Sequence, residues 1–146
     1  MQAIIFDLDH TIFDANQVLH DGAADLLAIL KNLGVAVGAL SSKDHRILVH
    51  LDEAGIRDYF SEVLCNAHHE SPKSTAALER LLKQLRVEPD ATTLVSHAHA
   101  DILLGKDARV AKTIGVSHGM DNVAPLKEAG ADYIVADIPA VLDVLE

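Results

Sequence analysis

The amino-acid sequence predicts an α/β fold, a Rossmann-like three-layer sandwich with a mostly parallel central sheet. Short apolar runs of strand length alternate along the chain with longer segments whose apolar residues recur every three or four positions. A strand–helix–strand–helix order requires parallel strands joined by right-handed crossovers. Apolar residues make up 49% of the chain and aromatic residues only 3%, so Ala, Val, Leu and Ile must build the core between the layers.

The expected strands are the short apolar runs. They fall at residues 2–7, 35–40, 62–65, 92–96, 113–116 and 133–136. We expect a single domain spanning residues 1–146, because a chain of 146 residues fits one domain and contains no repeat, low-complexity segment or linker.

The expected helices are marked by helical spacing and by capping residues. Gly34 and Gly55 follow the first two helices as C-caps. Ser71, with Pro72 at the first helical position, is expected to begin the third helix. Further helices are expected at residues 101–112 and 123–129, and Pro139 begins a helical tail. The periodic positions of the first three helices are Ala23, Leu26, Leu27, Leu30 and Leu33, then Ile47, Leu48, Leu51 and Ala54, then Leu78, Leu81, Leu82 and Leu85.

Composition excludes several classes of partner. The formal net charge is −10 and there is no run of Lys or Arg, which argues against nucleic acid and against an anionic membrane surface as partners. Cys65 is the sole cysteine, so an internal disulfide is excluded. The first residues lack a basic segment, and Asp7 and Asp9 interrupt their apolar run. We therefore expect no signal peptide and no membrane span, and a cytoplasmic location by default.

Polar residues that could take part in catalysis or binding follow the expected strands. Because ligands of parallel α/β sheets bind at the carboxyl ends of the strands, these residues should gather at one edge. The set consists of Asp7, Asp9 and Thr11, then Ser41 and Ser42, then Lys73, then His97, His99 and Asp101.

Asp7 and Asp9 are two residues apart at the end of a strand, a spacing that points both side chains the same way in extended backbone. An ionised Asp7 could attack phosphorus and form an aspartyl phosphate. Asp9 could protonate the leaving group and then accept a proton from water. The simpler interpretation is that the two aspartates only form a turn or cap a helix. The apolar run before them and Thr11 after them favour a catalytic role.

The run IFDLDHT at residues 5–11 resembles the first motif of the haloacid dehalogenase superfamily, usually FDxDGT, with His10 in place of the glycine. The run ALSSK at residues 39–43 is similar to the second motif. The resemblance implies that Asp7 is the nucleophile and that the hydroxyls of Thr11, Ser41 and Ser42 contact the phosphoryl group. The alternative interpretation of Ser41, without a role in phosphate binding, is that it is an ordinary helix N-cap.

The remaining motifs of the resemblance lie further along the chain. Lys73 corresponds to the third-motif lysine, which would neutralise phosphate and the Asp7 carboxylate. The run LVSHAHAD at residues 94–101 resembles the fourth motif, usually GDxxxD, with Asp101 as its second acid and His97 in place of the first. By resemblance, the metal ligands are Asp7, the Asp9 backbone carbonyl, Asp101 and the residue at position 97. Within the superfamily, the sequence is most similar to that of the phosphoglycolate phosphatase-like members.

The implied cofactor is a divalent cation, Mg²⁺ in the family. Imidazole binds Mg²⁺ poorly and suits Mn²⁺, Co²⁺, Ni²⁺ or Zn²⁺ better. His97 therefore leaves two outcomes open, a recruited transition metal or weak Mg²⁺ binding, and the latter is slightly favoured. The chain has nine histidines, most of which follow expected strands and are either solvated loop residues or proton-transfer and metal groups. Those after strands are His10, His45, His68, His69, His97, His99 and His118.

The intervals between the motifs leave no room for a cap domain. Residues 12–40 are consumed by one loop and one helix, and residues 43–72 by a helix and a strand. By resemblance, cap-less members act on large substrates or close their sites by self-association, so a homo-oligomer is one expectation.

The sequence therefore predicts an enzyme, a metal-dependent phosphomonoester hydrolase that acts on a small phosphorylated substrate through an aspartyl phosphate. The alternative is a non-catalytic binding protein of the same fold with a degenerate metal site, which His97 favours. A response-regulator receiver is set aside, because residues 64–67 after the third strand contain no Asp.

Overall fold

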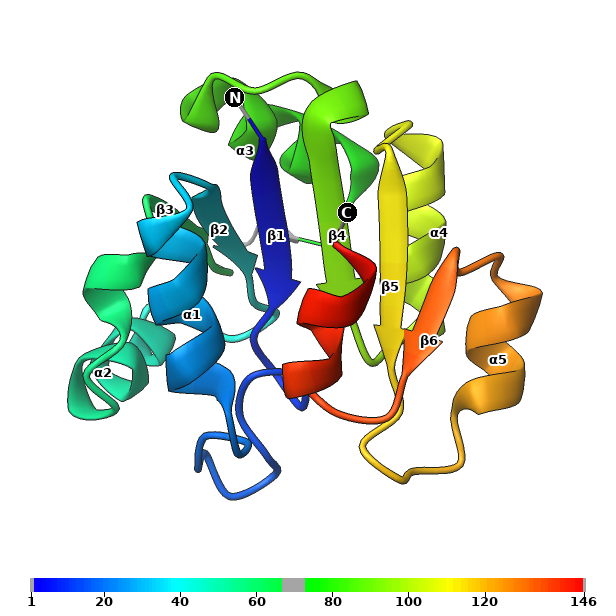
Figure 1. Cartoon of the computed structure of the whole chain (residues 1–146). Helices are drawn as coiled ribbons and strands as arrows, with labels where there is room; N and C mark the ends of the chain where they lie inside the picture. The colour runs from blue at the N-terminus through cyan, green and yellow to red at the C-terminus, as the bar shows by residue number, and fades with distance from the viewer. Residues whose placement is uncertain (1, 67–72, 146) are drawn as a thin grey trace.

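The computed structural model describes residues 2–66 and 73–145. Their six strands form one sheet, which is flanked by helices (Figure 1). The strand order is β3-β2-β1-β4-β5-β6, and all five strand pairs are parallel. The expected Rossmann-like fold is therefore confirmed. The strands are β1 (Ala3–Asp7), β2 (Ala36–Leu40), β3 (Glu62–Leu64), β4 (Thr92–Ser96), β5 (Lys112–Val116) and β6 (Tyr133–Val135).

Two helical layers cover the sheet. The α-helices are α1 (Ala23–Asn32), α2 (Arg46–Glu53), α3 (Thr75–Leu85), α4 (His99–Asp107) and α5 (Val123–Glu128). The 3₁₀ helices are η1 (Arg57–Tyr59), η2 (Pro89–Ala91) and η3 (Pro139–Val144). No helix within the described ranges is long and apolar enough to cross a membrane.

The two faces of β1 show how alternation builds the layers. Ile4 and Phe6 belong to the core cluster that contains the buried side chains of α1, whereas Ala3 and Ile5 belong to the cluster that contains those of α3. Successive strand residues point to opposite faces, so β1 is buried on both sides, as expected of a central parallel strand.

Helix ends differ from expectation in two places. The expected start at Ser71 and Pro72 lies outside the described residues, and α3 begins instead at Thr75, where the Ser74 hydroxyl accepts a hydrogen bond of 3.1 Å from the Ala77 amide. The expected helix at residues 101–112 is α4, which begins at His99 and ends at Asp107. It ends early because Arg109 adopts a left-handed conformation (φ 62°) that an α-helix cannot continue.

Other boundary expectations are confirmed. Gly34 and Gly55 take left-handed φ values of 75° and 72° just beyond α1 and α2, as C-cap glycines do. The interval between Thr11 and Ser41 contains only a loop, α1 and β2, so it holds no cap domain. Within its described part, the interval after Ser42 contains α2, η1 and β3.

Candidate active site

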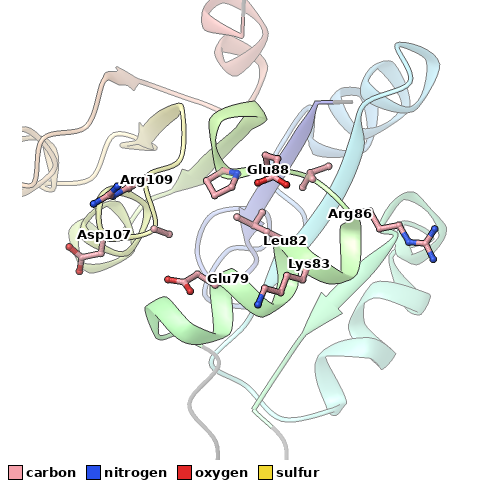
Figure 2. Close-up of a pocket in the computed structure, with 10 residues that line it drawn as sticks. Glu79, Leu82, Lys83, Arg86, Glu88, Asp107 and Arg109 are labelled. Atoms are coloured by element: carbon pink, nitrogen blue, oxygen red, sulfur yellow. The ribbon is translucent and has the colours of Figure 1, made fainter.

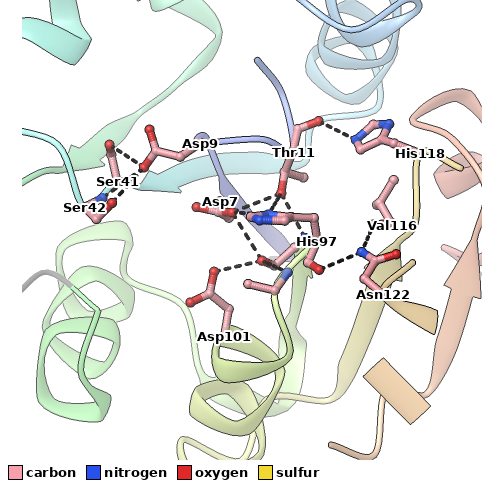
Figure 3. Close-up of polar contacts among 12 residues, drawn as sticks. Asp7, Asp9, Thr11, Ser41, Ser42, His97, Asp101, Val116, His118 and Asn122 are labelled. Atoms are coloured by element: carbon pink, nitrogen blue, oxygen red, sulfur yellow. Dashed lines mark hydrogen bonds and ion pairs between the residues drawn. The ribbon is translucent and has the colours of Figure 1, made fainter. Parts of the chain in front are cut away.

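Buried polar side chains gather at the carboxyl ends of the strands. Parallel pairing brings the ends of β1, β2 and β4 to one edge of the sheet. The buried polar residues there are Asp7, Asp9, Thr11, Ser41, Ser96 and Asp101. A buried charge is costly unless it is paired and hydrogen-bonded, so the partners of these groups define the site (Figure 3).

Asp7 ends β1 and is the centre of the site. Its Oδ1 accepts a hydrogen bond of 2.6 Å from Lys73 Nζ. Its Oδ2 faces Thr11 Oγ1 at 3.0 Å, His97 Nδ1 at 3.0 Å and Ser96 Oγ at 3.3 Å. Burial raises the pKa of Asp7, but the hydrogen bond to His97 and the charge of Lys73 outweigh burial and bring the pKa below its ordinary value. Asp7 is therefore an ionised carboxylate at neutral pH.

Lys73 joins two carboxylates from different elements. Its Nζ lies 2.6 Å from Asp7 Oδ1 and 3.0 Å from Asp101 Oδ2, which belongs to the first turn of α4. Burial lowers the pKa of Lys73, but the charges of Asp7 and Asp101 outweigh burial and raise the pKa above its ordinary value. Burial and the charge of Asp7 raise the pKa of Asp101 in spite of Lys73. The ammonium group is therefore held charged between the two acids.

Asp9 has a separate set of partners. Its Oδ2 accepts hydrogen bonds from Ser41 Oγ at 3.0 Å, the Ser42 amide at 3.1 Å and Ser42 Oγ at 3.2 Å. Its Oδ1 is buried without a hydrogen-bond partner, and Lys43 Nζ lies 4.0 Å from it. Figure 3 shows Asp9 turned toward these serines. Asp9 and Asp7 thus share an edge of the sheet but, among the described contacts, no hydrogen-bond partner.

The structure brings most sequence-predicted residues together, in two groups. Asp7, Thr11, Lys73, His97 and Asp101 form one hydrogen-bonded group. Ser41 and Ser42, the two serines expected to contact a phosphoryl group, form the second group with Asp9, to which both donate.

Sequence reasoning missed Ser96, the last residue of β4. Its hydroxyl lies 2.8 Å from Asp101 Oδ2 and 3.3 Å from Asp7 Oδ2, so it links the two acids, as Lys73 does. The available signal was its position: it is a polar residue at the end of a buried strand, beside the residue that replaces the motif acid.

The histidines separate into distinct environments. His97 contacts Asp7, and the ring of His10 lies 5.4 Å from the ring of His97. His118 donates from Nε2 toward the Thr11 carbonyl oxygen at 3.0 Å and stacks on His20 at 3.6 Å. Burial, then the charge of His20, lowers the pKa of His118. His99 and His45 are exposed, and the predicted positions His68 and His69 lie outside the described residues.

The arrangement around Asp7 does not fit a divalent cation. An ionised carboxylate only accepts hydrogen bonds, so His97 Nδ1, at 3.0 Å from Asp7 Oδ2, must carry the proton and has no lone pair for a metal. Lys73 holds the other oxygen of Asp7. Within residues 2–66 and 73–145, no three His, Cys, Asp or Glu side chains are grouped so that they could hold a metal ion.

A cavity of about 660 Å³ lies elsewhere, along the C-terminal part of α3 and the segments that lead into β4 and β5 (Figure 2). Its charged lining residues are exposed. They are Glu79, Lys83, Arg86, Glu88, Asp107 and Arg109. Asp7, Asp9 and Asp101 do not line this cavity, so it lies apart from the candidate active site.

Comparisons with known proteins agree with the fold. Residues 15–109 match the family of haloacid dehalogenase-like hydrolases. No curated protein matches the chain by sequence. A haloacid dehalogenase-like hydrolase from Streptococcus pneumoniae is structurally similar with a TM-score of 0.85 and 15% identity, over 100% of this chain and 99% of that one.

Two further solved structures carry names of phosphoryl chemistry. A protein from Thermotoga maritima assigned as a β-phosphoglucomutase has a TM-score of 0.87 and 15% identity, over 99% of this chain and 98% of that one. A predicted phosphoglycolate phosphatase from Haemophilus somnus has a TM-score of 0.78 and 22% identity, over 88% of this chain and 57% of that one. At these identities the similarity shows the fold.

Proposed function

The chain belongs to the haloacid dehalogenase-like hydrolases, and from that premise we propose that it hydrolyses phosphate monoesters of small molecules through an aspartyl-phosphate intermediate. The observation that carries the proposal is Asp7, a buried carboxylate at the end of β1 with Lys73 Nζ at 2.6 Å. A lowered pKa keeps Asp7 ionised, and therefore able to attack, at neutral pH, and the ammonium group offsets its repulsion from a phosphate dianion.

The proposed reaction has two halves. In the first, a carboxylate oxygen of Asp7 forms a bond to phosphorus while the bond to the ester oxygen breaks, and Asp9 gives that oxygen a proton. In the second, Asp9 takes a proton from water, whose oxygen attacks the phosphorus and releases inorganic phosphate and free Asp7. Lys73 supplies the positive charge for the phosphoryl oxygens. The hydroxyls of Thr11, Ser41 and Ser42 donate to Asp7 and Asp9 in this structure and would turn to the phosphoryl oxygens when a substrate binds.

The family resemblance also implies a divalent cation, Mg²⁺ or a transition metal such as Mn²⁺, Co²⁺ or Ni²⁺. Such a cation would offset the repulsion between Asp7 and phosphate. The donors around Asp7 are arranged for hydrogen bonds instead, so both half-reactions above use only groups of the chain.

A non-catalytic phosphate-binding protein is the second candidate, and one observation favours it. The position of the first motif acid is taken by His97, which contacts the nucleophile itself. Such a protein would bind phosphorylated ligands without turning them over.

An aryl phosphate assay separates the two candidates. We expect the wild-type protein to release the aryl alcohol, and borohydride to trap the intermediate as a reduced side chain at position 7, detected by peptide mass spectrometry. Asp7→Asn should show neither signal while keeping the wild-type circular dichroism spectrum. Turnover by Asp7→Asn at the wild-type rate would exclude Asp7 as nucleophile.

Self-association is a further part of the proposal. A site without a cap lacks the water exclusion that closure provides. Exposed apolar side chains near the carboxyl edge, Val18, Met120 and Val123, could meet a second copy. We expect light scattering to give a mass above that of one chain at micromolar concentration, and a monomer would contradict this.

A further inference from the structure

We propose that His97 takes the place of the divalent cation beside Asp7, so that this chain binds and transfers phosphate without a metal ion. The inference rests on the proposed function for its catalytic part only. Its structural basis is the contact of 3.0 Å between His97 Nδ1 and Asp7 Oδ2, the carboxylate oxygen that Lys73 does not hold.

The two carboxylate oxygens of Asp7 have different partners. Oδ1 is neutralised by the ammonium group of Lys73. Oδ2 would be the oxygen open to a cation, but donors converge on it from Thr11, Ser96 and His97. A hydrogen-bond donor does for a carboxylate part of what a cation does: it stabilises the negative charge and fixes the direction of the oxygen.

Hydrogen bonds hold the backbone of His97 on both sides of the residue. Its backbone amide donates to Thr11 Oγ1 at 2.9 Å, and its carbonyl oxygen accepts from Asn122 Nδ2 at 2.9 Å. Asn122 also donates to the Val116 carbonyl at 3.2 Å, so the backbone at His97 is tied both to the loop after β1 and to the end of β5. The ring therefore extends toward Asp7 from a backbone that is fixed on two sides. This fixed backbone holds the contact between His97 and Asp7 in place.

The residue at position 97 also sets the charge of the site. An aspartate at position 97 would add a fourth carboxylate beside Asp7, Asp9 and Asp101, with Lys73 and Lys43 as the lysines near them. Like charges at such distances repel strongly in a buried site, so an acid there requires a cation. A histidine that donates from Nδ1 offers no lone pair on the side that faces Asp7, and it adds no negative charge for a cation to offset.

The experiment uses metal-stripped full-length protein, with inorganic phosphate as the binding probe and an aryl phosphate as substrate. We expect wild-type phosphate affinity and turnover to change less than twofold when Mg²⁺ is added to chelator-treated protein. In His97→Asp, phosphate binding without metal should weaken at least tenfold and recover with Mg²⁺, and calorimetry should detect Mg²⁺ binding to this variant alone. His50→Asp on α2 makes the same change of side chain away from the site and should behave as wild type.

A second variant covers failure of His97→Asp to fold. His97→Asn retains an N–H donor near the position of Nδ1 but no ring, and it should keep metal-independent phosphate binding within about threefold. Wild-type phosphate binding that falls more than tenfold on chelation and returns with Mg²⁺ would overturn the inference. Metal-independent phosphate binding without turnover under any condition would support the role of His97 in binding and contradict the hydrolase proposal instead.

Discussion

The two edges of the sheet differ in how they treat charge. At the carboxyl edge, Asp7 and Asp101 are buried and meet Lys73 at 2.6 and 3.0 Å. At the opposite edge, the 660 Å³ cavity is lined by charged side chains that stand in solvent, such as Glu79 and Asp107. Water screens exposed charges, whereas buried pairs are screened much less and shift each other's pKa. Paired burial is therefore a better guide to chemistry in this molecule than cavity volume.

The direction of the helices gives this difference a cause. In a parallel α/β sheet, each helix that follows a strand begins at the carboxyl edge, as α4 does directly after β4. Helix N-termini carry partial positive charge and stabilise nearby anions. Asp101 lies in the first turn of α4, whereas Asp107 lies at its last residue. One helix thus presents favourable surroundings for a carboxylate at one edge and unfavourable surroundings at the other.

The same substitution at both edges of the sheet tests this difference most directly. Asp7→Asn should lower turnover of an aryl phosphate by at least about 10³-fold, since it removes the nucleophile. Asp107→Asn, in the lining of the opposite cavity, should leave turnover within twofold of wild type. The steady-state rates of both variants are the measurement. A larger loss of turnover in Asp107→Asn than in Asp7→Asn would indicate that catalysis takes place at the cavity.

The next effect is on stability. Lys73→Ala leaves two buried carboxylates together without their cation and should cost about 3–5 kcal/mol of unfolding free energy, besides weakening phosphate binding and turnover. Lys106→Ala breaks an exposed ion pair with Asp132 and should cost less than about 1 kcal/mol. Urea denaturation of the two variants gives the difference. Equal losses would mean that the Lys73 pairs are no stronger than a surface pair.

Asp9 provides a subtler comparison within the carboxyl edge. Asp9→Asn removes the proposed acid but not the nucleophile, so the rate should fall about 10²-fold or more for alkyl phosphates and much less for nitrophenyl phosphate, whose leaving group needs no proton. The measurement is the dependence of rate on leaving-group pKa. An equal loss for good and poor leaving groups would indicate that Asp9 only supports Ser41 and Ser42.

Much of this arrangement could be predicted from sequence, because it depends on local pattern. Strand alternation and strand-end position placed Asp7 and Asp101 at one edge, and the structure pairs both with Lys73. The proton on His97 Nδ1 could not be predicted, since it depends on which atom of a residue 90 positions away faces the ring. The early end of α4 depends on the left-handed backbone of Arg109, which propensity alone does not reveal.

The smallest expected effect concerns His118, which stacks on His20 and donates to the Thr11 carbonyl beside the site. Burial and the charge of His20 lower the pKa of His118 in the folded protein, so the unfolded chain takes up this proton first as pH falls. The corresponding stability is present above about pH 6.5, the ordinary histidine value, and is lost as the pH drops through the folded-state pKa. The low pKa of Asp7 has its effect only in more acidic solution, below about pH 4.

His118→Gln keeps an amide donor for Thr11 but does not titrate, so its unfolding free energy should fall less than that of wild type between pH 7.5 and pH 5.5. His50→Gln on α2 is the matched control and should retain the wild-type pH dependence. Urea denaturation at the two pH values measures the difference. If His118→Gln loses as much stability on acidification as wild type does, the stacked pair does not contribute to the pH dependence.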